Sequence, residues 1–179
     1  GLPREYEPLE YLDNSNLQHI LENGTICGDG LAIYPNAGLK LKAKFSTDYT
    51  SSGSMQALAG ATKSGSAFGF ELAVNNDGGV YAVHCKVGRT EFDCSYGTAG
   101  KVVEAELSKD GLWLDGVKQD ADFSTGLDAT ATSQKLYVLA GITGTSAGRR
   151  FYGHLHWLQL YLDDVLVRDY VPCREIATG

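Results

Sequence analysis

Short stretches in which apolar and polar side chains alternate recur along this chain, and turn residues separate them. In residues 39–45, the clearest stretch, four apolar residues alternate with three lysines. A period of two is the pattern of a strand that is buried on one face. Gly accounts for 22 of the 179 residues and Pro for only 4, which favours tight turns between strands. We therefore expect about ten to twelve short strands, as in an all-β sandwich or barrel.

Further strands are expected where the same alternation, or a short apolar run, lies between turn signals. They are residues 17–21, 55–61, 67–74, 79–85, 101–107, 112–114, 135–142, 151–162 and 165–171. The segment 135–142 is apolar on both faces, which predicts a central strand. In the segment 151–162 the apolar phase changes near His156 and Trp157, which predicts a β-bulge there. The pattern as a whole predicts a two-sheet antiparallel β-sandwich.

Charge and length limit the classes of function. The chain has 15 Lys and Arg against 22 Asp and Glu, a net charge of −7. Nucleic acids are bound mainly by basic side chains, so we expect no nucleic-acid partner. It has no run of 18 apolar residues, so we expect no membrane insertion. We expect one domain over residues 1–179, with residues 1–16 as an N-terminal arm packed on the sandwich. Gly1 is not a natural start residue, which indicates a segment of a longer protein.

The four cysteines do not have the spacing of a zinc or redox motif. Cys85 and Cys94 bracket the segment 86–93, which fits a hairpin. A cross-strand disulfide is compatible with this arrangement. Buried free thiols are the interpretation we favour.

Both ends of the chain carry motifs that resemble a known domain. Residues 2–20 resemble the LP-x-x-Y-x-x-LEYI…QYI opening of a domain common in phage structural proteins and in surface proteins of gut bacteria. Residues 151–174 are similar to its closing F-x-G-x-I…LVRDFVPC motif, and residues 107–117 to the laminin-G hairpin that ends in Asp-Gly. The resemblance implies a concanavalin A-like, LamG-type jelly roll. The chain departs from the opening motif at residues 19–24 and stops before the GLYD segment of the family, so we expect a C-terminal truncation.

The sequence offers no catalytic motif. Glycosidases need two carboxylates that flank the scissile bond, and the nearest approach is Glu104 and Glu106, which we interpret as part of a solvated strand face. His154 and His156 would share one face of a regular strand, but the bulge would separate them, so we expect no metal site. We expect no enzyme activity and no cofactor. Calcium, which many LamG-type domains hold on rim loops, stays open without a diagnostic motif, with the candidate ligands Asp48, Asp77, Asp120 and Asp122.

Aromatic residues that are out of phase with the core provide candidate ligand contacts. Sugars stack on Trp and Tyr rings, and neighbouring polar groups bind their hydroxyls. Trp157 lies at the phase change of its strand, and Trp113 is opposite in phase to its two leucine neighbours. We expect a binding site formed first by Trp157 with His156, Gln159 and Tyr161, and second by Trp113. The alternative for each tryptophan is a packing role on the second face, under a loop or the N-terminal arm.

The expected function is non-catalytic recognition. A lectin-like module that binds a carbohydrate or a host receptor, with a role in adhesion, fits a phage virion protein or a bacterial surface protein. Its location would then be the virion or the extracellular surface. The first alternative is a structural virion decoration or oligomerisation domain, which would contact other virion or surface-protein subunits. The second is an unrecognised glycoside hydrolase, because the same fold hosts lectins, enzymes and scaffolds.

Overall fold

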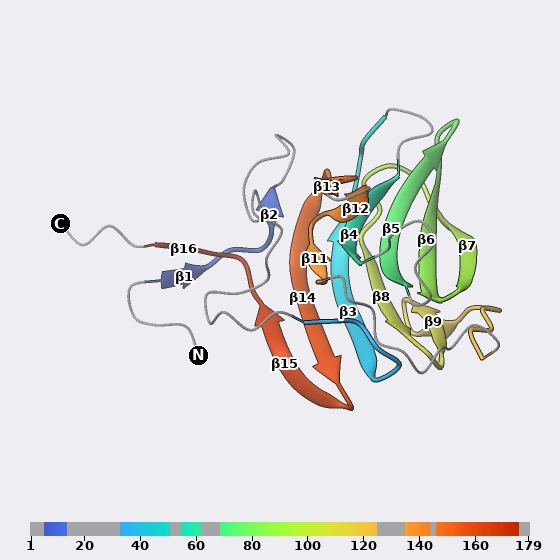
Figure 1. Ribbon diagram of the computed structural model, residues 1–179. Helices are drawn as coiled ribbons and strands as arrows, with labels where there is room; N and C mark the ends of the chain where they lie inside the picture. The colour runs from blue at the N-terminus through green and yellow to red at the C-terminus, as the bar shows by residue number, and fades with distance from the viewer. Residues whose placement is uncertain are drawn as a thin grey trace.

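The computed structural model describes residues 6–13, 33–50, 55–61, 69–124, 135–143 and 146–175. Across these residues the chain forms two main antiparallel sheets, one of seven strands and one of five, which pack as a sandwich (Figure 1). The described residues contain no helix, and thus none that is long and apolar enough to cross a membrane. The predicted all-β, two-sheet antiparallel sandwich is confirmed.

The seven-stranded sheet has the order β10-β9-β8-β3-β14-β15, and β2 pairs with the start of β14. Its strands are β2 (Leu12–Asp13), β3 (Leu39–Ser46), β8 (Val103–Ser108), β9 (Gly111–Leu114), β10 (Val117–Lys118), β14 (His154–Leu162) and β15 (Val165–Tyr170). The five-stranded sheet has the order β11-β4-β5-β6-β7. Its strands are β4 (Gln56–Gly60), β5 (Gly69–Asp77), β6 (Val80–Gly88), β7 (Thr90–Gly97) and β11 (Tyr137–Val138). Two small pairs join β1 (Tyr6–Pro8) to β16 (Cys173–Glu175) and β12 (Gly141–Thr143) to β13 (Ser146–Gly148).

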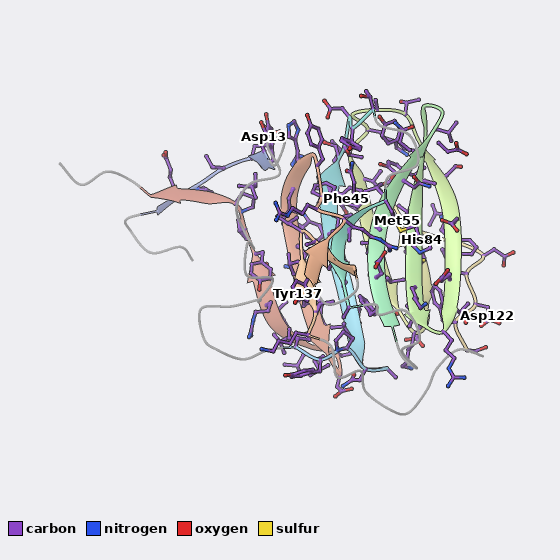
Figure 2. All side chains as sticks on the ribbon, turned by 45° about the horizontal axis from the view of Figure 1, so that its top comes forward. Asp13, Phe45, Met55, His84, Asp122 and Tyr137 are labelled. Carbon is purple, nitrogen blue, oxygen red and sulfur yellow. The ribbon has the colours of Figure 1, made fainter. Side chains whose placement is uncertain are left out.

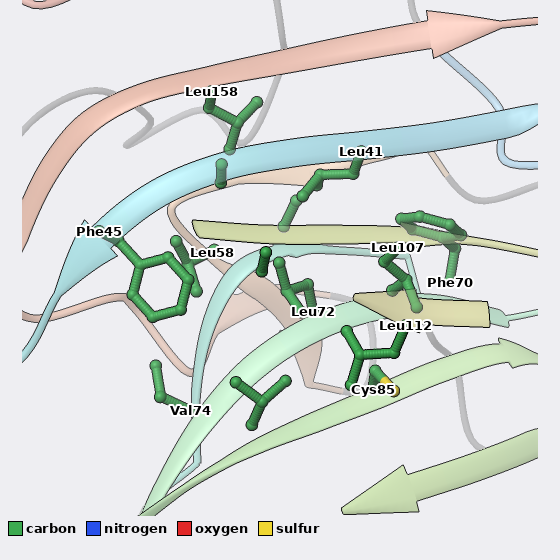
Figure 3. Packing of buried hydrophobic residues seen from close by; sticks show 14 of the residues in the cluster. Leu41, Phe45, Leu58, Phe70, Leu72, Val74, Cys85, Leu107, Leu112 and Leu158 are labelled. Carbon is green, nitrogen blue, oxygen red and sulfur yellow. The ribbon is translucent and has the colours of Figure 1, made fainter. Parts of the chain in front are cut away.

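The hydrophobic core fills the space between the two sheets. Leu41 and Phe45 of β3 are fully buried there, and the lysines that alternate with them lie on the outer face. Figure 2 shows Phe45 inside the sandwich, and Figure 3 shows Leu41 and Phe45 facing Phe70, Leu72 and other residues of the five-stranded sheet. The alternation in residues 39–45 therefore predicted the buried face correctly.

The predicted β-bulge in β14 is confirmed. The register between β14 and β3 shifts between Leu155 and Trp157, so that His156 is the extra residue. Leu155 and Leu158 are both buried in the core, whereas His156 and Trp157 are half-buried. One inserted residue reverses the alternation, which is why leucines of opposite phase face the same core.

The prediction of a central strand over residues 135–142 is wrong. The segment divides into β11, at the edge of the five-stranded sheet, and β12, which pairs with β13 and passes β4. Leu139 lies between them with a φ of 58°, which a strand residue does not adopt. Its amide donates to the Leu58 carbonyl at 2.6 Å and its carbonyl accepts from the Phe151 amide at 3.0 Å. The apolar character on both faces reflects this buried bend.

The two cysteines that bracket residues 86–93 lie on the adjacent strands β6 and β7. Cys85 lies opposite Phe92, and Cys94 opposite Val83, so the cysteines are not a directly opposed pair. Both are free thiols. Cys85 is buried, and burial raises the pKa of its thiol to about 12. Both thiols are thus free as expected, but only Cys85 is buried, because Cys94 is half-buried. The strand predicted over residues 17–21 lies outside the described residues.

The N-terminal arm contacts the rest of the chain in two places. Strand β1 pairs with β16, and the Leu9 amide donates to the Pro172 carbonyl at 2.9 Å. Further along, β2 pairs with β14, and the Tyr11 ring stacks on His154 with 4.0 Å between the ring centroids. Leu12 packs against the core. Figure 1 shows that β2 lies beside the sandwich, whereas the β1–β16 ribbon extends away from it.

Deletion of residues 2–12 is expected to lower the melting temperature by several degrees. The deletion removes the packing of Leu12 and the stacking of Tyr11, each worth about 1 kcal/mol. In a protein of this size 1 kcal/mol corresponds to about 2–4 °C. Thermal unfolding followed by circular dichroism measures the change. An unchanged melting temperature would show that the arm is not an integral part of the sandwich.

Candidate functional site

The outer face of the seven-stranded sheet brings most of the predicted ligand residues onto one surface. Trp157, Gln159 and Tyr161 of β14 lie opposite the three outward lysines of β3. Trp113 of β9 lies on the same side, because its partner Glu106 pairs in turn with Lys42. We call this surface the ladder face, and it comprises Lys40, Lys42, Lys44, Glu104, Glu106, Trp113, Trp157, Gln159 and Tyr161.

Each lysine of the ladder face is paired with a carboxylate. Lys42 Nζ lies 2.7 Å from Glu106 Oε2, and Lys44 Nζ lies 3.3 Å from Glu104 Oε1. Lys40 is bonded to Asp164, and this hydrogen bond raises the pKa of Lys40. These groups are partly exposed, so the pairs contribute little to stability. In the middle of the surface, each positive charge is therefore neutralised by a neighbouring negative charge, and both groups can form hydrogen bonds.

Hydrogen bonds hold the Tyr161 ring in place on this surface. The Tyr161 hydroxyl donates to Gln159 Oε1 at 2.9 Å, and Gln159 Nε2 donates to Asp169 Oδ1 at 3.1 Å. The ammonium groups of Lys40 and Lys42 lie 5.6 and 5.8 Å from the centroid of the Tyr161 ring. Gln159 therefore positions Tyr161, and it keeps one N–H and one lone pair for a ligand.

Neither tryptophan of the ladder face belongs to the core. Trp113 and Trp157 are half-buried and lie outside the hydrophobic cluster between the sheets. The Nζ atom of Lys118 lies 5.1 Å from the centroid of the Trp113 ring, a cation–π distance. A place in the core between the sheets is therefore not supported for either side chain, whereas half-burial fits both a ligand contact and packing on the outer face under a loop or the N-terminal arm.

His156 differs from the other predicted residues because it faces the N-terminal arm. Its ring lies edge-on to Tyr11, with 5.6 Å between the centroids. The neighbouring His154 stacks on the same tyrosine, and its Nε2 atom lies 4.0 Å from Asp13 Oδ1. The structure thus places His156 in an aromatic cluster beside Trp157, at the border of the ladder face.

The candidate calcium ligands are all exposed carboxylates. Asp122 accepts a hydrogen bond from the Ser124 amide at 2.9 Å, and hydrogen bonding from Ser124 lowers the pKa of Asp122. Asp120 and Asp122 line an open cavity of about 560 Å³ next to Lys118. Among the described residues, no three Asp, Glu, His or Cys side chains are grouped so that they could hold a metal ion.

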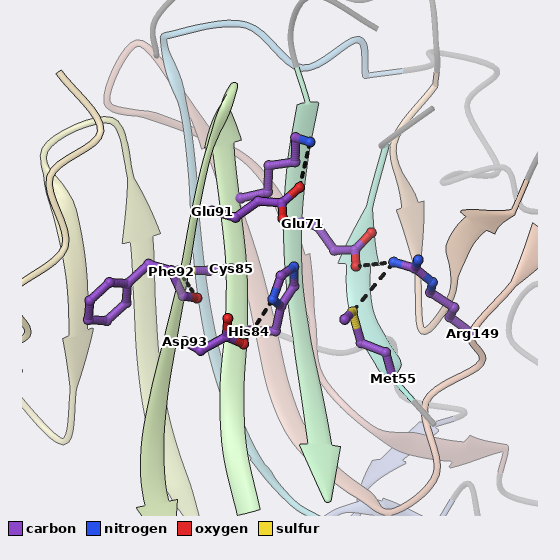
Figure 4. A network of polar contacts seen from close by, with 9 residues as sticks. Met55, Glu71, His84, Cys85, Glu91, Phe92, Asp93 and Arg149 are labelled. Atoms are coloured by element: carbon purple, nitrogen blue, oxygen red, sulfur yellow. Dashed lines mark hydrogen bonds and ion pairs between the residues drawn. The ribbon is translucent and has the colours of Figure 1, made fainter. Parts of the chain in front are cut away.

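A second group of polar residues, which the sequence analysis missed, lies on the outer face of the five-stranded sheet (Figure 4). Glu71 of β5 has a side chain only 1% exposed, and Arg149 Nη1 donates to its Oε1 at 2.9 Å. The same Arg149 nitrogen lies 3.4 Å from Met55 Sδ. On β6, His84 Nδ1 lies 2.9 Å from Asp93 Oδ1. We call these residues, with the neighbouring Lys86–Glu91 pair, the polar network.

The local backbone makes room for the buried carboxylate of Glu71. A Cβ atom on Gly60 would lie 3.1 Å from Glu71 Oε2, and one on Gly141 would lie 3.4 Å from it. Arg149 has a φ of 48°, an uncommon conformation for this residue type. The sequence did contain a signal for a covered outer face, since the outward neighbours of Glu71 on β5 are the small residues Gly69 and Ala73.

Sequence comparison assigns no family to the chain. No known family model matches it, and no curated protein is significantly similar to it in sequence. We therefore infer the function from the ladder face and the polar network.

Proposed function

We propose that this chain is a non-catalytic carbohydrate-binding module and that the ladder face is its glycan site. The observation that carries the proposal is the position of Trp113, Trp157 and Tyr161 on one outer sheet face, half-buried and outside the core. Large aromatic rings contribute most when they are covered. A sheet that presents three such rings to the outside is suited to a ligand whose flat C–H surfaces cover them.

The groups between the rings support the same ligand class. Sugar hydroxyls need both donors and acceptors, and the Lys42–Glu106 and Lys44–Glu104 pairs supply both within the ladder. An ammonium group has three donors and a carboxylate about four acceptor positions, so each paired group keeps capacity for a ligand. Gln159 adds one further donor and acceptor.

The proposed fold family is the concanavalin A-like, LamG-type jelly roll, and the proposed setting is a phage virion protein or a bacterial surface protein. The antiparallel two-sheet sandwich supports the family, as do the motifs in residues 2–20 and 151–174. In this setting the module would act in adhesion to a host glycan or receptor.

Trp157→Ala is expected to weaken glycan binding by about twofold to twelvefold, because a stacked ring contributes about 0.5–1.5 kcal/mol beyond its buried area. A glycan array on the isolated domain identifies ligands, and titration calorimetry with the variant measures the loss. Tyr34→Ala is the matched control, because it removes an aromatic ring that is 44% exposed and does not belong to the ladder face. The preceding residue, Ile33, accepts a hydrogen bond from the Leu136 amide, next to β11 of the five-stranded sheet. A folded Trp157→Ala variant with undiminished affinity would remove Trp157 from the site.

A structural role is the second candidate, and the exposed edge strand β15 favours it. Val165, Leu166 and Val171, in or next to this strand, are 64%, 45% and 45% exposed, and apolar strand edges pair readily with other chains. Light scattering over a range of concentrations tests this candidate. A stable oligomer without glycan binding would replace the carbohydrate proposal.

Catalysis is not part of the proposal. A glycosidase needs one carboxyl group with a raised pKa to act as the acid. In the polar network the pKa of Glu91 is shifted in the opposite direction, because the hydrogen bond from Lys86 lowers it. On the ladder face, Glu104 and Glu106 are paired with lysines. Release of reducing sugars that is lost on Glu71→Gln or Glu106→Gln would show that the chain is an enzyme.

A further inference from the structure

The register of the seven-stranded sheet fixes how far apart the aromatic rings of the ladder face are. Trp113 lies opposite Glu106, Glu106 opposite Lys42, and Lys42 opposite Gln159. These four residues form one row across β9, β8, β3 and β14. Three strand spacings of about 4.8 Å separate the ends of the row, which gives about 14 Å from Trp113 to Gln159.

Trp157 lies two residues before Gln159 on the same strand, a further step of about 7 Å along the strand direction. The backbones at Trp113 and Trp157 are therefore about 16 Å apart on one face, given these strand dimensions. A single sugar ring, which is no larger than a tryptophan side chain, cannot contact both rings. A ligand that uses both must be an oligosaccharide that runs across the strands.

The charges between the two tryptophans determine which oligosaccharides fit. Both lysines of this region are paired, Lys42 with Glu106 at 2.7 Å and Lys44 with Glu104 at 3.3 Å. An acidic sugar that bonded to a free donor of either lysine would bring its negative charge next to the carboxylate already paired there, and the net charge of −7 on the chain adds repulsion. A neutral sugar can bond to the same pairs without separating them.

We propose that the ligand is a neutral oligosaccharide that lies across the strands of the ladder face and contacts Trp157 at one end and Trp113 at the other. This inference rests on the proposed carbohydrate-binding function. In it the Lys42–Glu106 and Lys44–Glu104 pairs bind hydroxyls in the middle of the ligand. The predicted first site at Trp157 and second site at Trp113 then become two ends of one site.

The test compares ligand length and charge. The probes are neutral gluco-, galacto- and N-acetylglucosamine oligosaccharides of one to about six sugars, together with sialylated and galacturonic acid oligosaccharides. We expect neutral oligosaccharides to bind with an affinity that rises at least tenfold with length and then stops rising, and with little change between low and high salt. We expect Trp113→Ala to remove this gain for long ligands and to leave the affinity of the shortest ones unchanged.

Each outcome separates the two proposals. If none of the probes binds, both the carbohydrate function and this inference fail. If sugars bind with an affinity independent of length, or if Trp113→Ala affects short and long ligands equally, the function stands and the cross-strand ligand is wrong. Preference for acidic sugars, with binding that weakens in salt, would overturn the neutral class. If Trp113→Ala does not fold, the length series on the unaltered chain decides, with Tyr34→Ala as the folded control.

Discussion

Phe45→Ala is expected to destabilise the domain by about 3–5 kcal/mol, the usual cost of removing a buried phenylalanine ring. Phe45 lies near the C-terminal end of β3 and is fully buried. The rings of Tyr96 and Phe151 meet it edge-to-face, with centroids 6.2 and 6.0 Å away. Tyr96 belongs to the five-stranded sheet and Phe151 precedes β14, so the substitution removes contacts with both sides of the sandwich.

Thermal and urea unfolding measure this loss. At about 2–4 °C for each kcal/mol in a protein of this size, the melting temperature should fall by about 6–20 °C. Lys44→Ala is the matched control, since Lys44 precedes Phe45 and forms a partly exposed pair with Glu104, which contributes about 1 kcal/mol or less. If both variants lose the same stability, the ring cluster around Phe45 does not hold the two sheets together.

The parts of the fold that local periodicity determines were predictable. The alternation in residues 39–45 predicted which side chains of β3 are buried, because a strand turns successive residues to opposite faces. The phase change beside His156 predicted the bulge in β14 for the same reason. Both features depend only on residues that are neighbours in sequence.

Features that depend on distant partners were not predictable. The bend at Leu139 is held by hydrogen bonds with Leu58 and Phe151, and nothing within residues 135–142 indicates it. Glu71 and Arg149 of the polar network are 78 positions apart in the sequence. The strand pattern shows that the Glu71 side chain points outward, and its small neighbours Gly69 and Ala73 indicate a covered face. Neither feature shows that Arg149 is the residue that pairs with Glu71.

The ladder face lies between these two cases. Its residues were predicted as two separate sites because Trp113 and Trp157 are far apart in the chain. The strand order β9-β8-β3-β14 places them on one face, and this order does not follow the sequence. Periodicity thus predicted that each tryptophan points away from the core, and the sheet topology shows that they share a surface.

Arg149→Met is expected to destabilise the domain by about 3 kcal/mol, at the lower end of the 3–5 kcal/mol typical when one partner of a buried ion pair is removed. The Glu71 side chain is 1% exposed, so its charge would stay buried without the arginine, whereas the Arg149 side chain is 40% exposed. This asymmetry means that most of the cost comes from the carboxylate. Removal of the charge should therefore restore stability, and Glu71→Gln combined with Arg149→Met should be more stable than Arg149→Met alone.

Urea unfolding of the two single variants and the double variant gives the coupling energy of the pair. Lys86→Met is the matched control, because Lys86 bonds at 2.8 Å to Glu91, whose side chain is 53% exposed. An exposed carboxylate that loses its partner is solvated by water, so this variant should lose about 1 kcal/mol or less. If Arg149→Met lowers the free energy of unfolding as little as Lys86→Met does, the arginine is not needed to stabilise the buried charge of Glu71. In that case the polar network would be a set of independent surface pairs on the five-stranded sheet.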